Sequence, residues 1–154
     1  MASAILAPAY PGLYETAFRF PAVDNHAHPL LKADHRESIP FEGLISEAQG
    51  DALVKDAVHT LACRRATRQL AELFGVKDFT WEDIKTRRSQ IDYLDLCRQC
   101  IEPTGIQCFL LDDGLGDGGI AETLCWHDQF THDHTRQIVR VESIAEVMAH
   151  YFAR

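Results

Sequence analysis

The sequence predicts an α/β fold with parallel strands, on three observations. Segments with the length and the apolar residues of strands occupy residues 20–25, 105–111 and 137–142. Between the first two runs, the chain carries the periodicity of amphipathic helices, and another helical pattern follows the third run. Strands that alternate with helices are typical of proteins built around a parallel sheet.

The first strand leads into a long loop. Residues 20–25 are apolar and are bounded by Pro21 and Pro29, which limit the run to the length of one strand. From residue 30 to residue 50 the composition turns mixed and polar, with proline and glycine residues that interrupt regular structure. We therefore expect a loop over residues 30–50, with room for a short helix.

Residues 51–74 carry the clearest helical pattern. Leu53, Ala57 and Leu61 recur every four residues, so they share one face of a helix. Gly75 stands where a glycine ends many helices. The pattern predicts one continuous helix over residues 51–74.

A second helical stretch covers residues 81–101. Thr80 and Asp83 form an approximate capping box at its start, with aspartate where glutamate or glutamine is more usual. The helical pattern weakens near Ser89, and a proline and a glycine follow position 101. We expect the stretch to break near Ser89 and to end before the second strand.

The second strand is predicted at residues 105–111. This nearly continuous apolar run is typical of a strand that is buried on both faces of a parallel sheet. Asp112 and Asp113 follow it directly. After a glycine-rich loop, the alternating pattern of residues 137–142 predicts a third strand, and a last helix is expected from Ser143.

The composition restricts the kinds of partner. Of the 154 residues, 46% are hydrophobic and 25% are charged, which is ordinary for a globular domain. The formal net charge of −8 and the pI of 5.4 disfavour nucleic-acid binding, which requires a basic surface. No apolar stretch approaches the roughly 20 residues of a membrane-spanning helix. We therefore predict no nucleic-acid partner and no membrane partner.

Cysteine usage predicts a cytoplasmic location. An odd number of cysteines lies in largely apolar segments, which fits reduced thiols better than a disulfide framework. Cys97 and Cys100 have the spacing of half a zinc site, but no second pair accompanies them and their surroundings are helical and apolar. We expect buried thiols at both positions.

Two histidines carry the strongest chemical signal. His26 and His28 come at the carboxyl end of the first strand, and residues two apart in an extended chain point to the same side. Both imidazoles can therefore meet one metal ion, and neutral imidazole is a good ligand for zinc and similar divalent metals. Taken alone, the spacing fits two surface histidines equally well.

The surroundings of this pair resemble a known family. The segment PAVDNHAHPL at residues 21–30 resembles the first strand of the amidohydrolase superfamily. More narrowly, it resembles the amidohydrolase-related domain that fungi and plants carry ahead of a glutamine-synthetase-like domain. Residues 110–115 (LLDDGL) and 140–142 (RVE) are similar to the second and third strand ends of that group. The resemblance runs from about residue 20 to the C-terminus.

The resemblance implies a fold and a chemistry. The chain would be the N-terminal part, about three βα units, of a TIM (β/α)₈ barrel, with an N-terminal extension at residues 1–19 and a partial barrel domain at 20–154. Members of the family bind one or two divalent metals, which activate water for hydrolysis of amide-like bonds, while some relatives decarboxylate. By this resemblance, His26 and His28 are metal ligands, the metal is zinc and the substrate is a small molecule.

The sequence also departs from the family. Relatives take further ligands from later strands, typically histidines from the fifth and sixth and an aspartate from the eighth, and this sequence has no positions to match them. A catalytic zinc normally has three protein ligands. We therefore expect the 154-residue chain to be inactive by itself. The alternative function is a non-catalytic relic or an interaction module, which could self-associate through an exposed sheet edge.

Further polar residues are candidates for contacting substrate or supporting the metal ligands. Asp24 lies two residues before the pair, where a supporting and a purely structural role are both open. Asp112 and Asp113 end the second strand, where aspartate also commonly bonds to the backbone of a turn. Arg140 and Glu142 alternate onto one face of the predicted third strand, where they could pair with each other or with an anionic substrate.

His127 is the remaining candidate. It begins a polar cluster at residues 127–134 for which we expect a solvated loop rather than a separate metal site. Because this loop follows the second strand, His127 could still line the mouth of the barrel.

Overall fold

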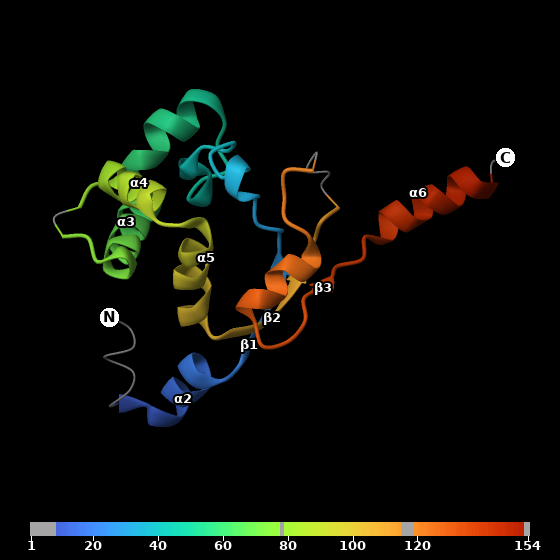
Figure 1. Cartoon of the computed structure of the whole chain (residues 1–154), viewed down its shortest axis with the longest axis horizontal. Coiled ribbons are helices and arrows are strands. Elements are labelled where there is room, and N and C mark those ends of the chain that lie inside the picture. Colours follow the sequence, from blue (N-terminus) through green and yellow to red (C-terminus); the bar gives the residue numbers. More distant parts are fainter. Residues whose placement is uncertain (1–8, 78, 115–118, 153–154) are drawn as a thin grey trace. The chain divides into compact units, whose positions relative to one another are not determined.

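The computed structural model describes residues 9–77, 79–114 and 119–152. They form a mixed α/β structure whose parallel sheet has the strand order β1-β2-β3 (Figure 1). The strands are β1 (Ala22–Ala27), β2 (Ile106–Leu111) and β3 (Arg136–Gln137). The prediction of an α/β fold with parallel strands is confirmed.

The chain falls into two compact units. The sheet unit combines Met1–Leu31 with Thr104–Arg154, and the helical unit is Lys32–Pro103. The helices of the sheet unit are α2 (Pro11–Arg19) and α6 (Val141–Phe152), and those of the helical unit are α3 (Leu61–Phe74), α4 (Trp81–Gln90) and α5 (Tyr93–Ile101). Short helical turns are η1 (Ala33–His35), η2 (Phe41–Leu44), η3 (Ala52–Asp56), η4 (Ala57–His59), η5 (Glu102–Thr104) and η6 (Leu124–Phe130). The predicted division into 1–19 and 20–154 stays a prediction.

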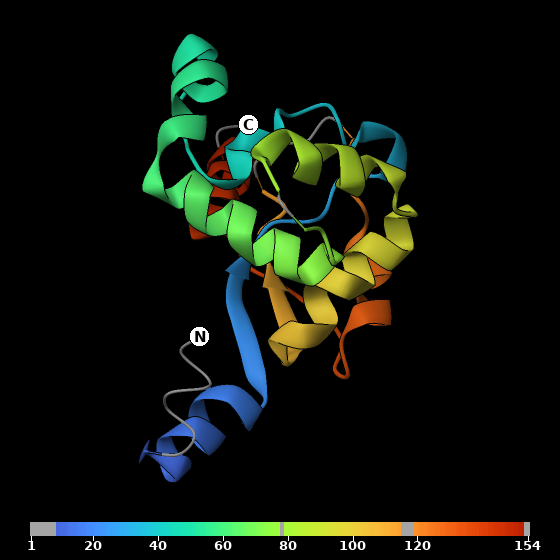
Figure 2. The same ribbon diagram turned by 90° about the vertical axis from the view of Figure 1, so that its left-hand side faces the viewer.

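The sheet brings the carboxyl ends of β1 and β2 together. The two strands run parallel beside each other (Figure 2). Ala27 lies opposite Leu111 at their ends. The pairing continues one step further, because the N–H of Asp112 donates to the carbonyl of Ala27 over 2.8 Å. Leu111 is 1% exposed, which fits the predicted burial of the second strand. This alignment decides which side chains meet at the end of the sheet.

The third strand is much shorter than predicted. Only Arg136 and Gln137 pair with β2, and α6 begins at Val141 where residues 137–142 were expected to be extended. Pairing ends because β2 itself ends at Leu111, whose carbonyl accepts the N–H of Ile138 over 2.8 Å. Beyond that point the segment is amphipathic, and it has an acidic residue where the first turn of a helix favours negative charge. Both features favour a helix over a strand.

The helical unit packs around a small apolar core. The core consists of Ala71 and Phe74 from α3, Ile84 from α4, Ile91 between helices and Leu96 from α5. Ile84 is completely buried. The predicted break of the 81–101 stretch is confirmed, and it falls at Ile91, two residues beyond Ser89.

The predicted helix ends of the helical unit are confirmed at two points. Gly75 ends α3 in the left-handed region, with φ of 66°, which glycine adopts without strain. Thr80 and Asp83 form a complete capping box at the start of α4, in which each side chain bonds to the other residue's N–H. The aspartate is long enough for this role.

The continuous helix over residues 51–74 is wrong in its first half. The turns η3 and η4 precede Thr60, whose backbone is extended and whose hydroxyl accepts the N–H of Cys63 over 3.1 Å. Threonine at this position is an N-cap, so α3 starts at Leu61. The four-residue periodicity did not reveal this interruption.

One buried carboxylate ties the helical unit together. Glu42 of η2 accepts hydrogen bonds from Trp81 Nε1 over 3.0 Å and from Lys85 Nζ over 2.9 Å. Burial by itself would raise the pKa of Glu42, but the hydrogen bonds from Lys85 and Trp81 outweigh it and lower that pKa below 4.5. The same pairing raises the pKa of Lys85.

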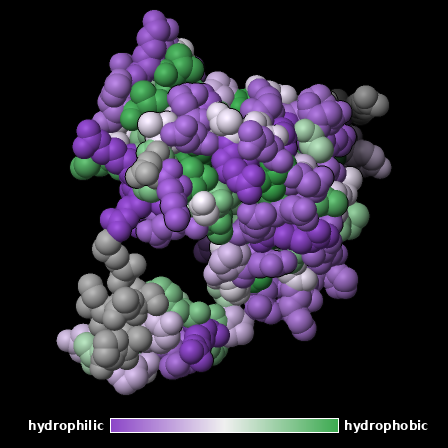
Figure 3. All heavy atoms as spheres, turned by 60° about the vertical axis from the view of Figure 1, so that its left-hand side comes forward, coloured by the Kyte–Doolittle hydropathy of each residue, from purple (hydrophilic) through white to green (hydrophobic). Residues whose placement is uncertain are grey.

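The surface is mostly hydrophilic on the face that Figure 3 shows, with hydrophobic side chains scattered among polar ones. The terminal helices carry much exposed apolar surface. Every residue of α6 is exposed, and so is every residue of α2 except the partly buried Tyr14. The extension was not predicted to contain a helix. Among the described helices, none combines the length and the apolar character that crossing a membrane demands.

Candidate metal centre

The histidine pair lies where the sequence predicts it, at the carboxyl end of β1. His26 belongs to the strand and His28 follows its last residue, Ala27. Both side chains are exposed, and their ring centres are 5.4 Å apart. Two imidazoles that share one tetrahedral zinc have ring centres about 5 Å apart, because Zn–N bonds are about 2 Å long. The spacing of the pair therefore fits a common metal ion.

His28 is held by the backbone of the neighbouring strand end. Its Nδ1 lies 2.9 Å from the carbonyl oxygen of Asp112. A carbonyl oxygen only accepts hydrogen bonds, so Nδ1 carries the hydrogen and Nε2 of the neutral ring is left with a free lone pair. Metal-binding histidines are commonly oriented by such a bond from the other ring nitrogen. The Nε2 of His28 is thus prepared to act as a ligand.

His26 faces the side chain of the same aspartate. Its Nε2 lies 3.6 Å from Oδ2 of Asp112, with 61% of the histidine side chain exposed and only 6% of the aspartate. The carboxylate of Asp24 makes a local contact, in which its Oδ1 accepts the backbone N–H of His26 over 3.3 Å. The structure thus places Asp24 as a local support of the strand and Asp112 beside both histidines.

Asp112 is the best anchored residue of the site. Its carboxylate accepts two hydrogen bonds from Arg140, Nε to Oδ1 over 2.8 Å and Nη2 to Oδ2 over 2.6 Å. The N–H of Gly114 adds a third bond to Oδ1 over 3.0 Å. Arg140 and then Gly114 hold the pKa of Asp112 well below its usual range, although burial opposes them. The carboxylate is therefore an anion at any ordinary pH.

Arg140 lies in the segment between β3 and α6, not on a strand as predicted. The hydrogen bonds to Asp112, and more weakly the charge of Glu142, raise the pKa of Arg140, while burial opposes them. Glu142 itself stands in the first turn of α6. The two residues were expected to pair with each other or with substrate, and the structure pairs Arg140 with Asp112 instead.

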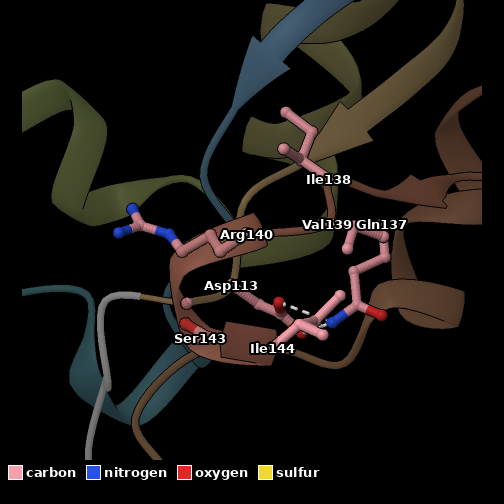
Figure 4. A pocket seen from close by; sticks show the side chains of 8 residues that line it. Asp113, Gln137, Ile138, Val139, Arg140, Ser143 and Ile144 are labelled. Atoms are coloured by element: carbon pink, nitrogen blue, oxygen red, sulfur yellow. Dashed lines mark hydrogen bonds between the residues drawn. The ribbon is translucent and has the colours of Figure 1, made fainter. Parts of the chain in front are cut away.

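Asp113 points to a different partner. Its two carboxylate oxygens accept from Nε2 of Gln137 over 2.8 Å and 3.1 Å. This pair lies at a pocket of about 280 Å³ that Ser143 and Ile144 of α6 also line. Figure 4 shows Gln137 reaching toward Asp113, while the guanidinium of Arg140 turns away from that pair. The adjacent aspartates thus serve two separate contacts.

His127 is buried inside η6 rather than solvated. It is 2% exposed, its Nε2 accepts the N–H of Leu30 over 3.0 Å, and its Nδ1 bonds the carbonyl of Thr123 over 2.9 Å. Phe109 and Trp126 pack edge-on against the ring. The expectation of a solvated loop is wrong for His127, because both ring nitrogens hold the chain together. His132, Asp133 and His134 of the same cluster are exposed.

The two cysteines of α5 differ. Cys97 is buried, and burial raises the pKa of its thiol to about 11. Cys100 is exposed, against the expectation of a buried thiol. All five cysteines are free thiols.

The candidate site fits a divalent cation in part. His26 and His28 have the spacing of two ligands, and the tautomer of His28 is already suited to binding. In the described ranges 9–77, 79–114 and 119–152, no group of three or more histidine, cysteine, aspartate or glutamate side chains is arranged to hold a metal ion. The pair alone would offer two ligands, and a catalytic zinc site normally has three from protein.

The role of Asp112 was only partly predicted from sequence. Parallel strands bring their carboxyl ends together, so contact between residues 28 and 112 could be expected once β1 and β2 were paired. The partnership of Asp112 with Arg140 was not expected, because it depends on the chain leaving β3 early. Gly114 was the signal in the sequence for this contact, because a side chain at position 114 would collide with Cδ of Arg140.

Comparison with known proteins finds a relative that shares most of this chain. Protein fluG of Emericella nidulans is 44% identical to this chain over 131 residues. The match covers 81% of this chain and 15% of that protein, so the chain spans only a small part of its relative's length. No family model matches the chain. No solved structure matches it either.

Proposed function

We propose that this chain provides the opening part of a metal-dependent hydrolase of the amidohydrolase type. The observation that carries the proposal is the orientation of His28, whose Nδ1 bonds the carbonyl of Asp112 and leaves Nε2 for a ligand bond beside His26. The resemblance of residues 21–30 to the first strand of that superfamily points the same way. In this proposal, His26 and His28 bind a divalent cation, and we expect zinc.

The chemistry follows from the ligand set. A divalent metal at this position would act as a Lewis acid and activate water for attack on an amide-like bond of a small-molecule substrate. His28 contributes a ring with a preset tautomer, and His26 contributes a second ring at matching distance. Asp112 is buried beside the pair, with Oδ2 at 3.6 Å from Nε2 of His26, and its carboxylate is fixed and charge-compensated by Arg140.

The fold proposal is that β1, β2 and β3 correspond to the first three strands of a (β/α)₈ barrel. Their order in the sheet follows their order in the chain, and they are parallel. The histidine pair stands at the carboxyl end of the sheet, the end at which such barrels build their active sites. The free thiols support the proposed cytoplasmic location.

Zinc binding by the whole chain is the direct test. Isothermal titration of the untagged chain with Zn²⁺ should give one site, lost in the variant His26→Ala/His28→Ala. The matched control is His59→Ala/His150→Ala, which removes two exposed histidines from elsewhere and should bind as the parent does. Equal binding by the parent and the His26/His28 variant would overturn the proposal. Because the pair supplies two ligands, we expect no turnover from this chain as a monomer.

The alternative is an interaction module without catalysis. In the described sheet, β1 and β3 are the outer strands, so their free edges could pair with another copy. Sedimentation velocity separates the two functions. A concentration-dependent dimer that ignores Zn²⁺ and the His26/His28 substitutions favours the interaction module, whereas a monomer that binds Zn²⁺ favours the metal site.

A further inference from the structure

The hydrogen-bond ladder between β1 and β2 has one irregular step, and it lies next to His28. Asp112 donates its N–H to the carbonyl of Ala27, as a regular parallel ladder requires. In such a ladder, the carbonyl of the same residue accepts from the N–H two positions further along the neighbouring strand. That position is Pro29, and proline has no N–H.

The imidazole of His28 occupies the place of the missing donor. Its Nδ1 bonds the carbonyl oxygen of Asp112 over 2.9 Å, so the acceptor is satisfied by a side chain instead of the backbone. The chain then turns away from β2, since the N–H of Leu30 donates to Nε2 of His127 over 3.0 Å. Pro29 therefore does two things: it ends the ladder and leaves one carbonyl for the ring of His28.

We propose that Pro29 and Asp112 are positioning residues that select the tautomer of His28. With an ordinary residue at position 29, a backbone N–H would compete for the carbonyl of Asp112, and the ring would lose its fixed orientation. With proline, Nδ1 holds the hydrogen and Nε2 is presented as a ligand atom. This inference deepens the proposed metal site and rests on it for its functional meaning, although the tautomer is a property of the metal-free chain.

The carbonyl of Asp112 is a rigid acceptor because the residue is held on both sides. Its N–H is bonded to Ala27, and its carboxylate is bonded to Arg140 and to the N–H of Gly114. Loosening Arg140 should therefore disturb His28 through Asp112, at a distance from the ring itself. This gives a second, independent way to reach the same bond.

Heteronuclear NMR of the imidazole nitrogens in the metal-free chain tests the proposal. At about pH 8, the parent should show His28 with hydrogen on Nδ1, as its bond to the carbonyl of Asp112 requires. Pro29→Ala should convert it to a mixture of tautomers and weaken Zn²⁺ binding by about 10- to 100-fold, the range for lost supports of metal ligands. Pro21→Ala, the same change at the other end of the β1 region, should alter neither measurement.

Arg140→Gln is the second variant, and it guards against a local folding defect in Pro29→Ala. It should also mix the tautomers of His28, while β1 and β2 remain paired by amide hydrogen exchange. Hydrogen on Nε2 of His28 in the parent overturns the inference, and so does an unchanged tautomer in both variants. If the parent shows the Nδ1 form but does not bind Zn²⁺, the proposed function fails while the positioning by Pro29 and Asp112 stands.

Discussion

Arg140 and Asp112 form a two-point ion pair at the carboxyl end of the sheet, with N–O distances of 2.8 Å and 2.6 Å. Planar guanidinium and carboxylate groups match in this geometry, so the pair fixes direction as well as distance. The aspartate side chain is only 6% exposed, whereas Arg140 keeps 28% of its side chain in solvent. The segment after β3 is thereby fastened to the end of β2.

The first prediction concerns the space that this pair requires. A Cβ at Gly114 would collide with Cδ of Arg140 and would lie 3.2 Å from Oδ1 of Asp112. Gly114→Ala should therefore push Arg140 out of its two-point contact and lower the free energy of unfolding by about 1–3 kcal/mol. Urea unfolding measures the loss. Gly12→Ala, where nothing lies within 4 Å, should be neutral or slightly stabilising in its helix.

The second prediction concerns Glu42 and acid. Its folded pKa is lowered from 4.5, so its contribution to stability is complete above about that pH and is lost as the pH falls through the folded pKa. Glu42→Gln should cost about 1 kcal/mol at neutral pH, the scale of one hydrogen bond to a partly exposed partner. The difference from the parent should shrink on acidification. A constant difference from neutral to strongly acidic pH would contradict this account.

Lys85 allows the same comparison of unfolding free energies at alkaline pH. Its folded pKa is raised from 10.5, so its contribution is present below that pH and disappears as the pH rises through the folded value. The unfolding free energies of the parent and of Glu42→Gln should therefore also converge at strongly alkaline pH. A variant at Glu82, whose contact with Lys85 is exposed and longer at 3.4 Å, should change much less.

The third prediction is that His127 is structural. His127→Phe keeps an aromatic ring between Phe109 and Trp126 but leaves the N–H of Leu30 without its nitrogen acceptor. This hydrogen bond is partly buried, and a donor left unsatisfied there should cost about 1–3 kcal/mol, which thermal unfolding measures. His132→Phe changes an exposed histidine in the same cluster and should stay within about 0.5 kcal/mol. Equal effects of the two substitutions would exclude the structural role.

The fourth prediction concerns the core of the helical unit. Ile84 is completely buried among the apolar side chains of α3 and α5, so Ile84→Ala should destabilise by about 2–5 kcal/mol. Leu61 is 83% exposed at the start of α3, and Leu61→Ala should be nearly neutral. Chemical unfolding of both variants provides the comparison. A small effect at Ile84 would mean that this core does not hold the helical unit together.

The sequence predicted the fold well where neighbouring residues determine the local structure. The left-handed Gly75 and the capping box of Thr80 and Asp83 depend on a few neighbouring residues, and both are found as expected. The second strand was also predicted nearly to the residue, because a continuous apolar run has few alternatives. These features share short-range causes that a single sequence contains.

Predictions failed where a distant partner strand or a competing helix cap determines the local structure. The helical periodicity of residues 51–74 is real, but the cap at Thr60 interrupts it. The alternation of residues 137–142 fits a strand, yet β2 offers partners only for Arg136 and Gln137. The link between Asp112 and Arg140 follows from this early strand end, so it could not be expected from the predicted strand.

The sequence predicted where the histidine pair lies in the fold. It did not predict how the ring of His28 is oriented. The spacing of His26 and His28 identifies the pair, and whether it binds metal stays a prediction. The function of Pro29 was hidden, because it appears only when the register of β1 against β2 is known. A proline after a histidine pair is uninformative until the opposite carbonyl is identified.

The bond between His28 and Asp112 joins residues that are 84 positions apart, with the whole helical unit in between. Closing so long a loop costs conformational entropy, and non-local contacts of this kind are slow to form. The helical unit is one continuous stretch of chain and depends on no such closure. The orientation of His28 should therefore be among the last features to appear during refolding, and a chain still being synthesised would expose both histidines long before Asp112 arrives to orient one of them.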